Sequence, residues 1–246
     1  MKALYLFFLM GLFMVSAQEK PLVIGHRGAM GYATENTLAS IQKALDFSVD
    51  AIEIDVYKIK SGELVVFHDN NVQRLTGTDS TIEDFTFEEL QKLTVKGGHK
   101  IPTLQQVMDL IGTKCRLNIE LKGANTAKDS YQVVIDYIAN KGWTKEQVIF
   151  SSFRWDELQK VYDLDSTMPL AVLTEKDPLL ALEVAGKLHA EAINPHYKSL
   201  TKDTVAKIHE KGFKIYTWTV NSKQYIAYMK MLGVDGIITN YPDRVQ

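Results

Sequence analysis

Two acidic residues and a histidine stand close together in one short stretch of the chain. In "AIEIDV", Glu53 and Asp55 alternate with apolar residues, so the two carboxylates share one face of an expected strand. After a Ser-Gly turn, a second apolar run (Leu64–Phe67) leads to His68. Paired carboxylates can hold a cation, and an imidazole can donate or accept a proton near neutral pH. The stretch therefore indicates metal-assisted acid–base chemistry.

A third carboxylate follows the same pattern in "LNIELK". The apolar residues of this segment occupy one face, which leaves Glu120 and Lys122 on the other. Converging carboxylates resist burial unless a cation compensates them. An all-oxygen ligand set favours one divalent cation, Mg²⁺ or Ca²⁺, over zinc, and predicts Glu53, Asp55 and Glu120 as its ligands. The alternative is polar alternation on a solvent-exposed antiparallel strand; the second acidic segment and the surrounding elements disfavour it.

The segment "GHRGAMGYATENT" follows the first apolar run of the chain. His26 ends the expected strand, and Arg27 offers a permanently charged, planar group that suits a phosphate. Lys122 adds a second positive charge at the same expected rim. A plainer interpretation is a turn and a helix cap, which Thr34, Asn36 or Thr37 could provide. That interpretation explains neither His26 nor Arg27.

Two histidines beside a metal and a cationic cradle suit the cleavage of a phosphodiester. His26 and His68 could remove a proton from the attacking hydroxyl group and protonate the departing alkoxide, in an order that the sequence leaves open. Asp69 is predicted to orient the loop by hydrogen bonding. Of the other histidines, His196 stands at a strand end and could reach the same rim. The remaining three are predicted to be solvated surface residues: His99, His189 and His209.

Short apolar runs alternate with amphipathic segments along the chain. The expected strands are Leu22–His26, Ala51–Val56, Leu117–Lys122, Val148–Phe153, Pro169–Thr174, Glu191–His196, Phe213–Val220 and Gly236–Asn240. The expected helices are Thr37–Phe47, Leu104–Ile111, Ala127–Asn140, Trp155–Tyr162, Leu179–Leu188, Asp203–Glu210 and Ser222–Met231. Eight strands linked by helices predict a (β/α)8 TIM barrel, with a doubly wound open sheet as the competitor. Leu64–Phe67 follows too short a connection for a crossover, so it predicts a small antiparallel hairpin insertion above the barrel mouth.

The composition indicates an exported chain with one domain. Lys2 precedes an apolar run, Leu4–Val15, that is about 12 residues long; this is too short to span a bilayer but typical of a signal peptide. We expect residues 1–17 to be that peptide, rather than a buried helix, and residues 18–246 to be the barrel domain, either periplasmic or secreted. No later run predicts membrane insertion. Cys115 is the sole cysteine, so no internal disulfide is expected, and a net charge of −2 argues against nucleic acid as a partner.

Taken together, the motifs resemble those of the glycerophosphodiester phosphodiesterases. The segments that match are "HRG…ENT", "EIDV", "VVFHDNNVQRLTG", "NIELK", "SSF", "WTVN" and "DGIITNYP", in family order from Val23 to Pro242. The resemblance implies a barrel that hydrolyses small-molecule glycerophosphodiesters to sn-glycerol 3-phosphate and an alcohol. It implies His26 and His68 as the acid–base pair. Family members often have Asp where Asn240 stands, a departure from which we expect no catalytic consequence.

The resemblance also implies the roles of the other site residues. It implies Glu53, Asp55 and Glu120 as ligands of one divalent cation, Mg²⁺ or Ca²⁺. The phosphate-contacting positions match Arg27 and Lys122. Trp218 matches an aromatic residue that lines the glycerol pocket, although it could instead fill the barrel.

Two other functions are compatible with the same barrel. A lysophospholipase D would need an apolar surface near the mouth, against which the polar segment Thr94–Lys100 argues. A non-catalytic binding barrel would have lost some of the two histidines and three acids, and all five are present. The nucleophile (water or the substrate's own hydroxyl group), the preferred alcohol and the oligomeric state stay open.

Overall fold

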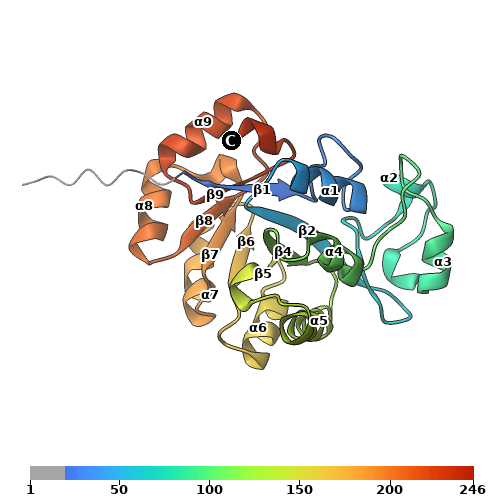
Figure 1. Cartoon of the computed structure of the whole chain (residues 1–246). Helices are drawn as coiled ribbons and strands as arrows, with labels where there is room; N and C mark the ends of the chain where they lie inside the picture. The colour runs from blue at the N-terminus through green and yellow to red at the C-terminus, as the bar shows by residue number, and fades with distance from the viewer. Residues whose placement is uncertain (1–19) are drawn as a thin grey trace, which may run out of the picture.

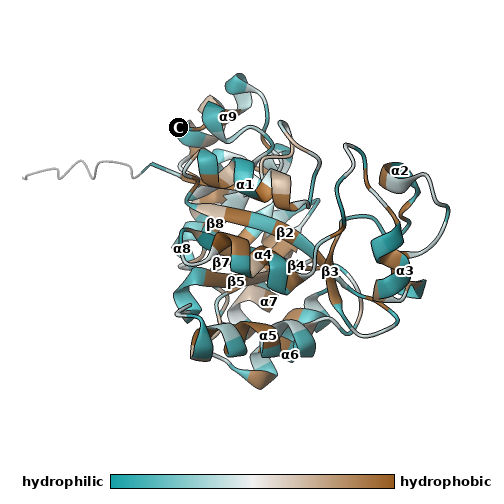
Figure 2. Ribbon diagram, turned by 45° about the vertical axis from the view of Figure 1, so that its right-hand side comes forward, coloured by the Kyte–Doolittle hydropathy of each residue, from teal (hydrophilic) through white to brown (hydrophobic). Residues whose placement is uncertain are grey.

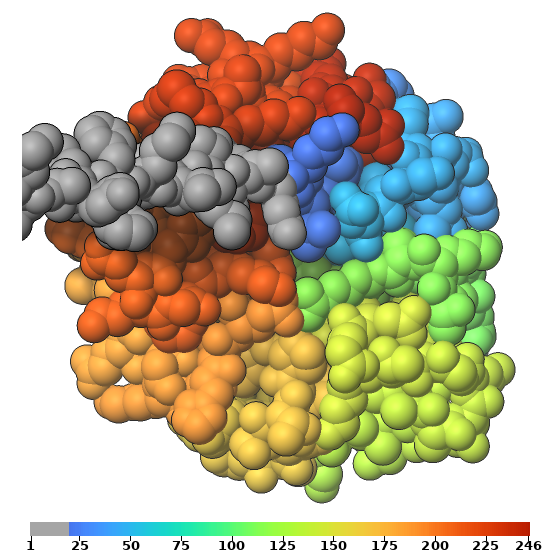
Figure 3. Space-filling view, turned by 60° about the vertical axis from the view of Figure 1, so that its left-hand side comes forward, coloured from blue at the N-terminus to red at the C-terminus, as the bar shows by residue number. Residues whose placement is uncertain are grey.

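The computed structural model describes residues 20–246, so the expected signal peptide at 1–17 lies outside the described residues and stays a prediction. The described chain forms a closed parallel barrel. Its strands are β1 (Leu22–His26), β2 (Ala51–Lys58), β4 (Arg116–Leu121), β5 (Val148–Ser152), β6 (Leu170–Thr174), β7 (Ala192–Pro195), β8 (Lys214–Thr217) and β9 (Gly236–Thr239). They pair in the order β1-β9-β8-β7-β6-β5-β4-β2, and a β1–β2 pairing closes the ring. Figures 1 and 3 show the elements following one another round the barrel in sequence order. The (β/α)8 prediction is confirmed, and the open sheet is excluded.

Helices cover the outside of the barrel (Figure 1). They are α1 (Leu38–Asp46), α4 (Leu104–Ile111), α5 (Ala127–Asn140), α6 (Trp155–Leu164), α7 (Leu182–Lys187), α8 (Lys202–Glu210) and α9 (Lys223–Leu232). Capping boxes begin several of them: the Thr37 and Thr103 hydroxyl groups accept from the third helical N–H, which satisfies a backbone donor that the first turn leaves free. The expected helix Leu179–Leu188 is divided, because a 3₁₀ turn at Pro178–Ala181 precedes α7.

The apolar faces of the strands pack outward against these helices. Ile52, Ile54 and Val56 of β2 are fully buried in the core between the barrel and the helices, as their alternation predicted. The opposite faces point into the barrel, whose lower part is filled by a second, smaller apolar cluster that includes Ile24 and Tyr216. In consequence the polar residues of β2 and β4 lie in the upper part of the barrel, toward the C-terminal ends of the strands.

An insert between β2 and α4 projects from one side of the barrel (Figure 1). Strand β3 (Leu64–Val66) pairs antiparallel with β2, as expected. The insert is larger than the small hairpin that the sequence indicated, because it also contains α2 (Gln73–Thr76), α3 (Phe87–Lys92) and a 3₁₀ turn (Ile82–Asp84). Helices of four and six residues are too short to give a recognisable amphipathic period.

The insert has an apolar core of its own. Phe67, Val72, Ile82 and Leu90 are almost completely buried in it. Figure 2 shows apolar residues along β3 and mostly hydrophilic residues on α3. This core holds the insert as a packed unit against the barrel mouth. Within the described residues, no helix has the length and apolar character needed to cross a bilayer.

Candidate active site

Three carboxylates from two neighbouring strands converge inside the barrel mouth. The β2–β4 register sets Asp55 beside Glu120 and Glu53 beside Asn118. One oxygen from each of Glu53, Asp55 and Glu120 lies within 4.8 Å of the others, and all three side chains are buried. Burial and then repulsion from Asp55 raise the pKa of Glu120 to about 7, although the Lys122 charge lowers it. Burial and then repulsion from Asp55 and Glu120 raise the pKa of Glu53.

This carboxylate cluster has the donor set of a site for a hard divalent cation. Its ligands are all oxygen atoms, they come from rigid strands, and burial together with mutual repulsion raises the pKa values of Glu53 and Glu120. A bound cation would offset that repulsion. Glu53, Asp55 and Glu120 could therefore hold a metal, and the structure brings together the three residues that the sequence indicated.

The loop after β1 turns sharply toward this cluster. Arg27 has a left-handed backbone conformation with a φ of 51°, followed by Gly28 with a φ of 81°. A side chain on Gly28 would collide with the backbone of Ser40, so only glycine fits there. Hydrogen bonds hold the strained turn: the Arg27 N–H donates to Glu53 (2.9 Å), and its carbonyl accepts from the Ser40 hydroxyl (2.8 Å).

His26 lies at the end of β1 with its two ring nitrogens in different surroundings. Nδ1 is 2.7 Å from the Asn240 side-chain oxygen, and Nε2 is 4.0 Å from a Glu53 oxygen, on the side of the cavity. An oxygen acceptor at Nδ1 requires the proton there, so Nε2 carries the lone pair. Burial, and then the Arg27 charge, lower the pKa of His26 to about 4.

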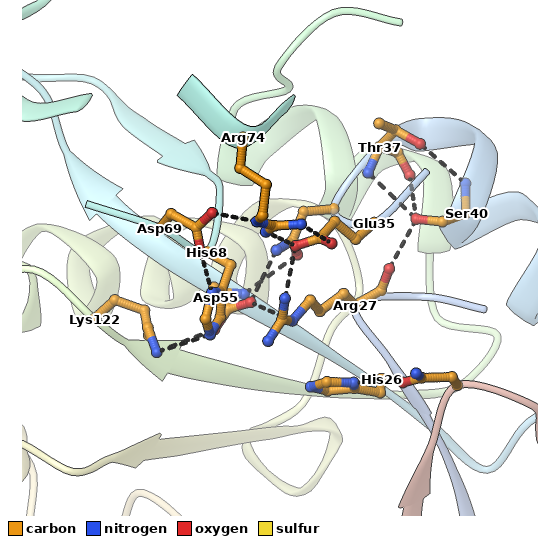
Figure 4. Close-up of polar contacts among 12 residues, drawn as sticks. His26, Arg27, Glu35, Thr37, Ser40, Asp55, His68, Asp69, Arg74 and Lys122 are labelled. Atoms are coloured by element: carbon orange, nitrogen blue, oxygen red, sulfur yellow. Dashed lines mark hydrogen bonds and ion pairs between the residues drawn. The ribbon is translucent and has the colours of Figure 1, made fainter. Parts of the chain in front are cut away.

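His68 is brought to the same cavity by the chain that follows β3. Its Nδ1 is 2.7 Å from an Asp69 oxygen, and its Nε2 is 3.3 Å from the Lys122 ammonium group. Burial lowers the pKa of His68 below its ordinary value, against the pull of Asp55 and Asp69. Asp69 thus orients an imidazole directly, a more specific role than the loop contact that the sequence indicated. Figure 4 shows the His68 ring beside Asp69 and Asp55.

Two cations border the carboxylate cluster. Arg27 Nη1 is 2.6 Å from Glu35, and its Nε is 3.3 Å from Asp55. Lys122 Nζ is 3.1 Å from Glu120. Both side chains also line the cavity, where they could meet an anionic group.

Apolar side chains form the other wall of the cavity, which with the open solvent at its mouth comprises about 450 Å³ of empty space. Trp218 lies on this wall beside Phe153, with ring centroids 5.4 Å apart, and its indole N–H donates to the Asn194 carbonyl (2.8 Å). The His196 ring meets the Trp218 ring edge to face, with centroids 5.1 Å apart, so His196 lies near the mouth, although it is not among the residues that line the cavity. Tyr216, two residues earlier, fills the barrel below.

The sequence analysis gave four polar residues of this region no part in the active site. Asn240 contacts His26 directly, so its departure from the common family residue does bear on a predicted catalytic group. Asn36 donates to Asp55 (2.8 Å) instead of capping α1, a role that Thr37 takes. Glu35, in the loop after β1, accepts from Arg74 of the insert, so this pair connects the two segments. Alternation within strands could not reveal these residues, because they lie in loops and in the insert.

The other histidines lie away from this group. His189 and His209 are exposed, as expected, whereas His99 is half-buried.

The sequence matches the glycerophosphoryl diester phosphodiesterase family over residues 26–244. Glycerophosphodiester phosphodiesterase from Caldanaerobacter subterraneus subsp. tengcongensis is 34% identical over 232 residues, which cover 91% of this chain and 96% of that protein. A human lysophospholipase D is 25% identical, with 91% of this chain and 84% of that protein covered.

A solved structure agrees with these sequence matches. An Oleispira antarctica phosphodiesterase in complex with the product sn-glycerol-3-phosphate superimposes with a TM-score of 0.84 at 27% identity, covering 92% of this chain and 96% of that chain. The family match spans most of the chain and includes every residue of the cavity described above. The chain therefore belongs to the glycerophosphoryl diester phosphodiesterase family.

Proposed function

We propose that the protein hydrolyses glycerophosphodiesters to sn-glycerol 3-phosphate and an alcohol. The observation that carries this proposal is the matched placement of two imidazoles. His26 and His68 each have Nδ1 against a side-chain oxygen, and each has Nε2 on the side of the carboxylate cluster. Two such groups at one cavity suit a reaction in which one proton is removed and another is delivered.

One divalent cation, Mg²⁺ or Ca²⁺, completes the proposed site. Glu53, Asp55 and Glu120 would hold it, since their oxygens converge within 4.8 Å. When bound, the cation would stabilise negative charge on the phosphate oxygens. Arg27 and Lys122 would contact the same phosphate, and the Trp218 wall would receive the glycerol carbons. The nucleophile can be water or the neighbouring glycerol hydroxyl group, which would benefit from proximity.

The acceptors at Nδ1 suggest how the two histidines divide the work. The Asp69 carboxylate stabilises a protonated imidazole more strongly than the neutral Asn240 amide does. We therefore assign His68 as the acid that protonates the departing alkoxide and His26 as the base that activates the nucleophile. A good leaving group such as p-nitrophenolate needs no acid. A substrate that releases it should therefore restore the turnover of His68→Ala much more than that of His26→Ala.

The test of the proposed function is hydrolysis of glycerophosphocholine, with coupled detection of sn-glycerol 3-phosphate. We expect activity that EDTA abolishes and that Mg²⁺ or Ca²⁺ restores. Lysophospholipids should be tried in parallel, because a preference for them would favour the lysophospholipase D alternative. Folded protein that binds the metal but releases no product from either substrate would favour a non-catalytic barrel.

Export stays part of the proposal. A signal peptide at residues 1–17 would place the enzyme in the periplasm or outside the cell, where it would act as a hydrolase of glycerol and lipid metabolism. Mass spectrometry of the natively expressed protein should then find Gln18 at the mature N-terminus. An intact Met1 on the protein would contradict export by this route.

A further inference from the structure

We propose that Arg74 of the insert is a positioning residue that holds both His68 and Arg27 in place, an inference that rests on the proposed function. Arg74 lies on α2, a one-turn helix whose neighbours Val72 and Leu75 are buried in the core of the insert. The backbone of Arg74 is therefore fixed by apolar packing. Its side chain extends from the insert toward the barrel mouth (Figure 4).

The guanidinium group of Arg74 meets two carboxylates at once. Nη1 and Nη2 donate to the two oxygens of Glu35 at 2.8 and 2.7 Å, and Nε donates to Asp69 at 2.5 Å. A planar fork with donors on two edges can make both contacts together, whereas an ammonium group is a single point charge. Arginine is thus chemically suited to this position in a way that lysine is not.

One carboxylate leads to the predicted acid. Asp69 accepts from Arg74 through Oδ2 and contacts His68 Nδ1 through Oδ1 (2.7 Å). With both oxygens engaged, the Asp69 side chain cannot rotate without losing a charge-assisted hydrogen bond. Arg74 therefore fixes Asp69, and Asp69 fixes the tautomer and direction of the His68 ring.

The other carboxylate leads to the predicted phosphate-binding cation. Glu35 is buried, and its Oε1 accepts from both Arg74 (2.7 Å) and Arg27 (2.6 Å). Burial alone would raise the pKa of Glu35, but these two guanidinium groups lower it, so the carboxylate stays charged between them. Without Arg74, the Glu35 carboxylate would pair with Arg27 alone. Its attraction would then draw the Arg27 side chain away from the cavity.

The two connections can be cut separately. Asp69→Asn weakens the contact to His68 and should lower kcat by about 10-fold, while Glu35→Gln weakens the contact to Arg27 and should mainly raise KM by about 10-fold. Arg74→Lys should produce both effects. The matched control is Arg116→Lys, which removes an equally bidentate Arg–Glu pair, at 2.7 and 2.7 Å, at the opposite end of the barrel.

The measurements are kcat and KM for glycerophosphocholine with saturating metal, and ¹⁵N NMR of the histidine rings. At pH 8, where the lowered pKa of His68 leaves its resting imidazole neutral, we expect His68 to change from a single Nδ1–H tautomer to a mixture in Arg74→Lys, with His26 unchanged as the internal reference. Arg116→Lys should change neither the kinetics nor the spectrum. If Arg74→Lys does not fold, the Asp69→Asn and Glu35→Gln proteins retain Arg74 and decide the question.

The proposal is overturned if the Arg74→Lys protein keeps kcat and KM within about twofold of the wild type, or if its His68 tautomer is unchanged. A purely structural role would lower the melting temperature alone. An inactive wild-type protein would refute the proposed function instead, and the NMR comparison would still decide whether Arg74 positions His68.

Discussion

Charged groups lie buried at one end of the barrel and half-buried at the other, and their charges are compensated to different degrees. At the N-terminal end, Glu191 accepts from Arg116 (2.7 Å) and from the Tyr216 hydroxyl (2.6 Å). Burial alone would raise the pKa of Glu191, but these donors lower it to about 2. At the mouth, Glu53 and Glu120 lie beside another carboxylate, and their pKa values are raised.

This difference shows what separates a structural ion pair from a binding site. The Glu191 carboxylate has found its donors within the protein, so its ionised form stabilises the fold. The carboxylate cluster at the mouth is held in place by rigid strands but keeps an excess of negative charge, so its ionised form destabilises the metal-free fold. A cation bound from solution would compensate the negative charge of such a cluster.

The largest expected effect comes from the two histidines at the mouth. Replacement of His26 or His68 by Ala should lower kcat at least about 100-fold, because each removes one proton-transfer group. Calorimetric metal affinity should stay close to the wild-type value, because neither imidazole belongs to the carboxylate cluster. Near-normal turnover in both variants would show that the acid–base assignment is wrong.

The Glu191 cluster predicts a loss of stability in acid. The folded-state pKa of about 2 lies below the ordinary value of 4.5, so the stabilisation is complete above about pH 4.5 and is lost as the pH falls toward 2. The expected contribution is about 2–3 kcal/mol, since one pKa unit corresponds to about 1.4 kcal/mol. The free energies of unfolding of the wild type and Glu191→Gln, measured by denaturant titration, should converge as the pH is lowered across this range. A difference that stays constant with pH would contradict the lowered pKa of Glu191.

A smaller effect is expected for Arg116→Lys. The lysine keeps the charge but loses the bidentate contact with Glu191, so the free energy of unfolding should fall by about 1–2 kcal/mol. Because the pair lies at the closed end of the barrel, kcat should not change. A fall in kcat of the folded protein would mean that the two ends are coupled.

The barrel could be predicted from the sequence because its signals are local. Strand alternation assigned Ile52 and Ile54 to the outer core and Glu53 and Asp55 to the interior, and the β2–β4 register then set Asp55 beside Glu120. The same alternation, applied to both strands, was sufficient to bring the carboxylate cluster together.

The groups that orient the histidines could not be predicted in this way. Asn240 and Arg74 reach the mouth from segments far along the chain or from helices of a few residues, and their contacts depend on the closed ring and on the packed insert. The asymmetry between the Asn240 amide at His26 and the Asp69 carboxylate at His68 is likewise a tertiary property. Periodicity carries no information about contacts of this kind.

The most direct test of the central comparison applies one substitution to both ends of the barrel. In metal-free protein at pH 8, above the pKa of about 7, Glu120→Gln should raise the free energy of unfolding by about 1–3 kcal/mol, because it removes a charge that the fold compensates poorly. Glu191→Gln should lower it by about 2–3 kcal/mol, because it leaves Arg116 without its charged partner. Denaturant titrations with EDTA measure both, and added Mg²⁺ or Ca²⁺ should then stabilise the wild type but not Glu120→Gln. Equal destabilisation by the two substitutions in EDTA would contradict the account.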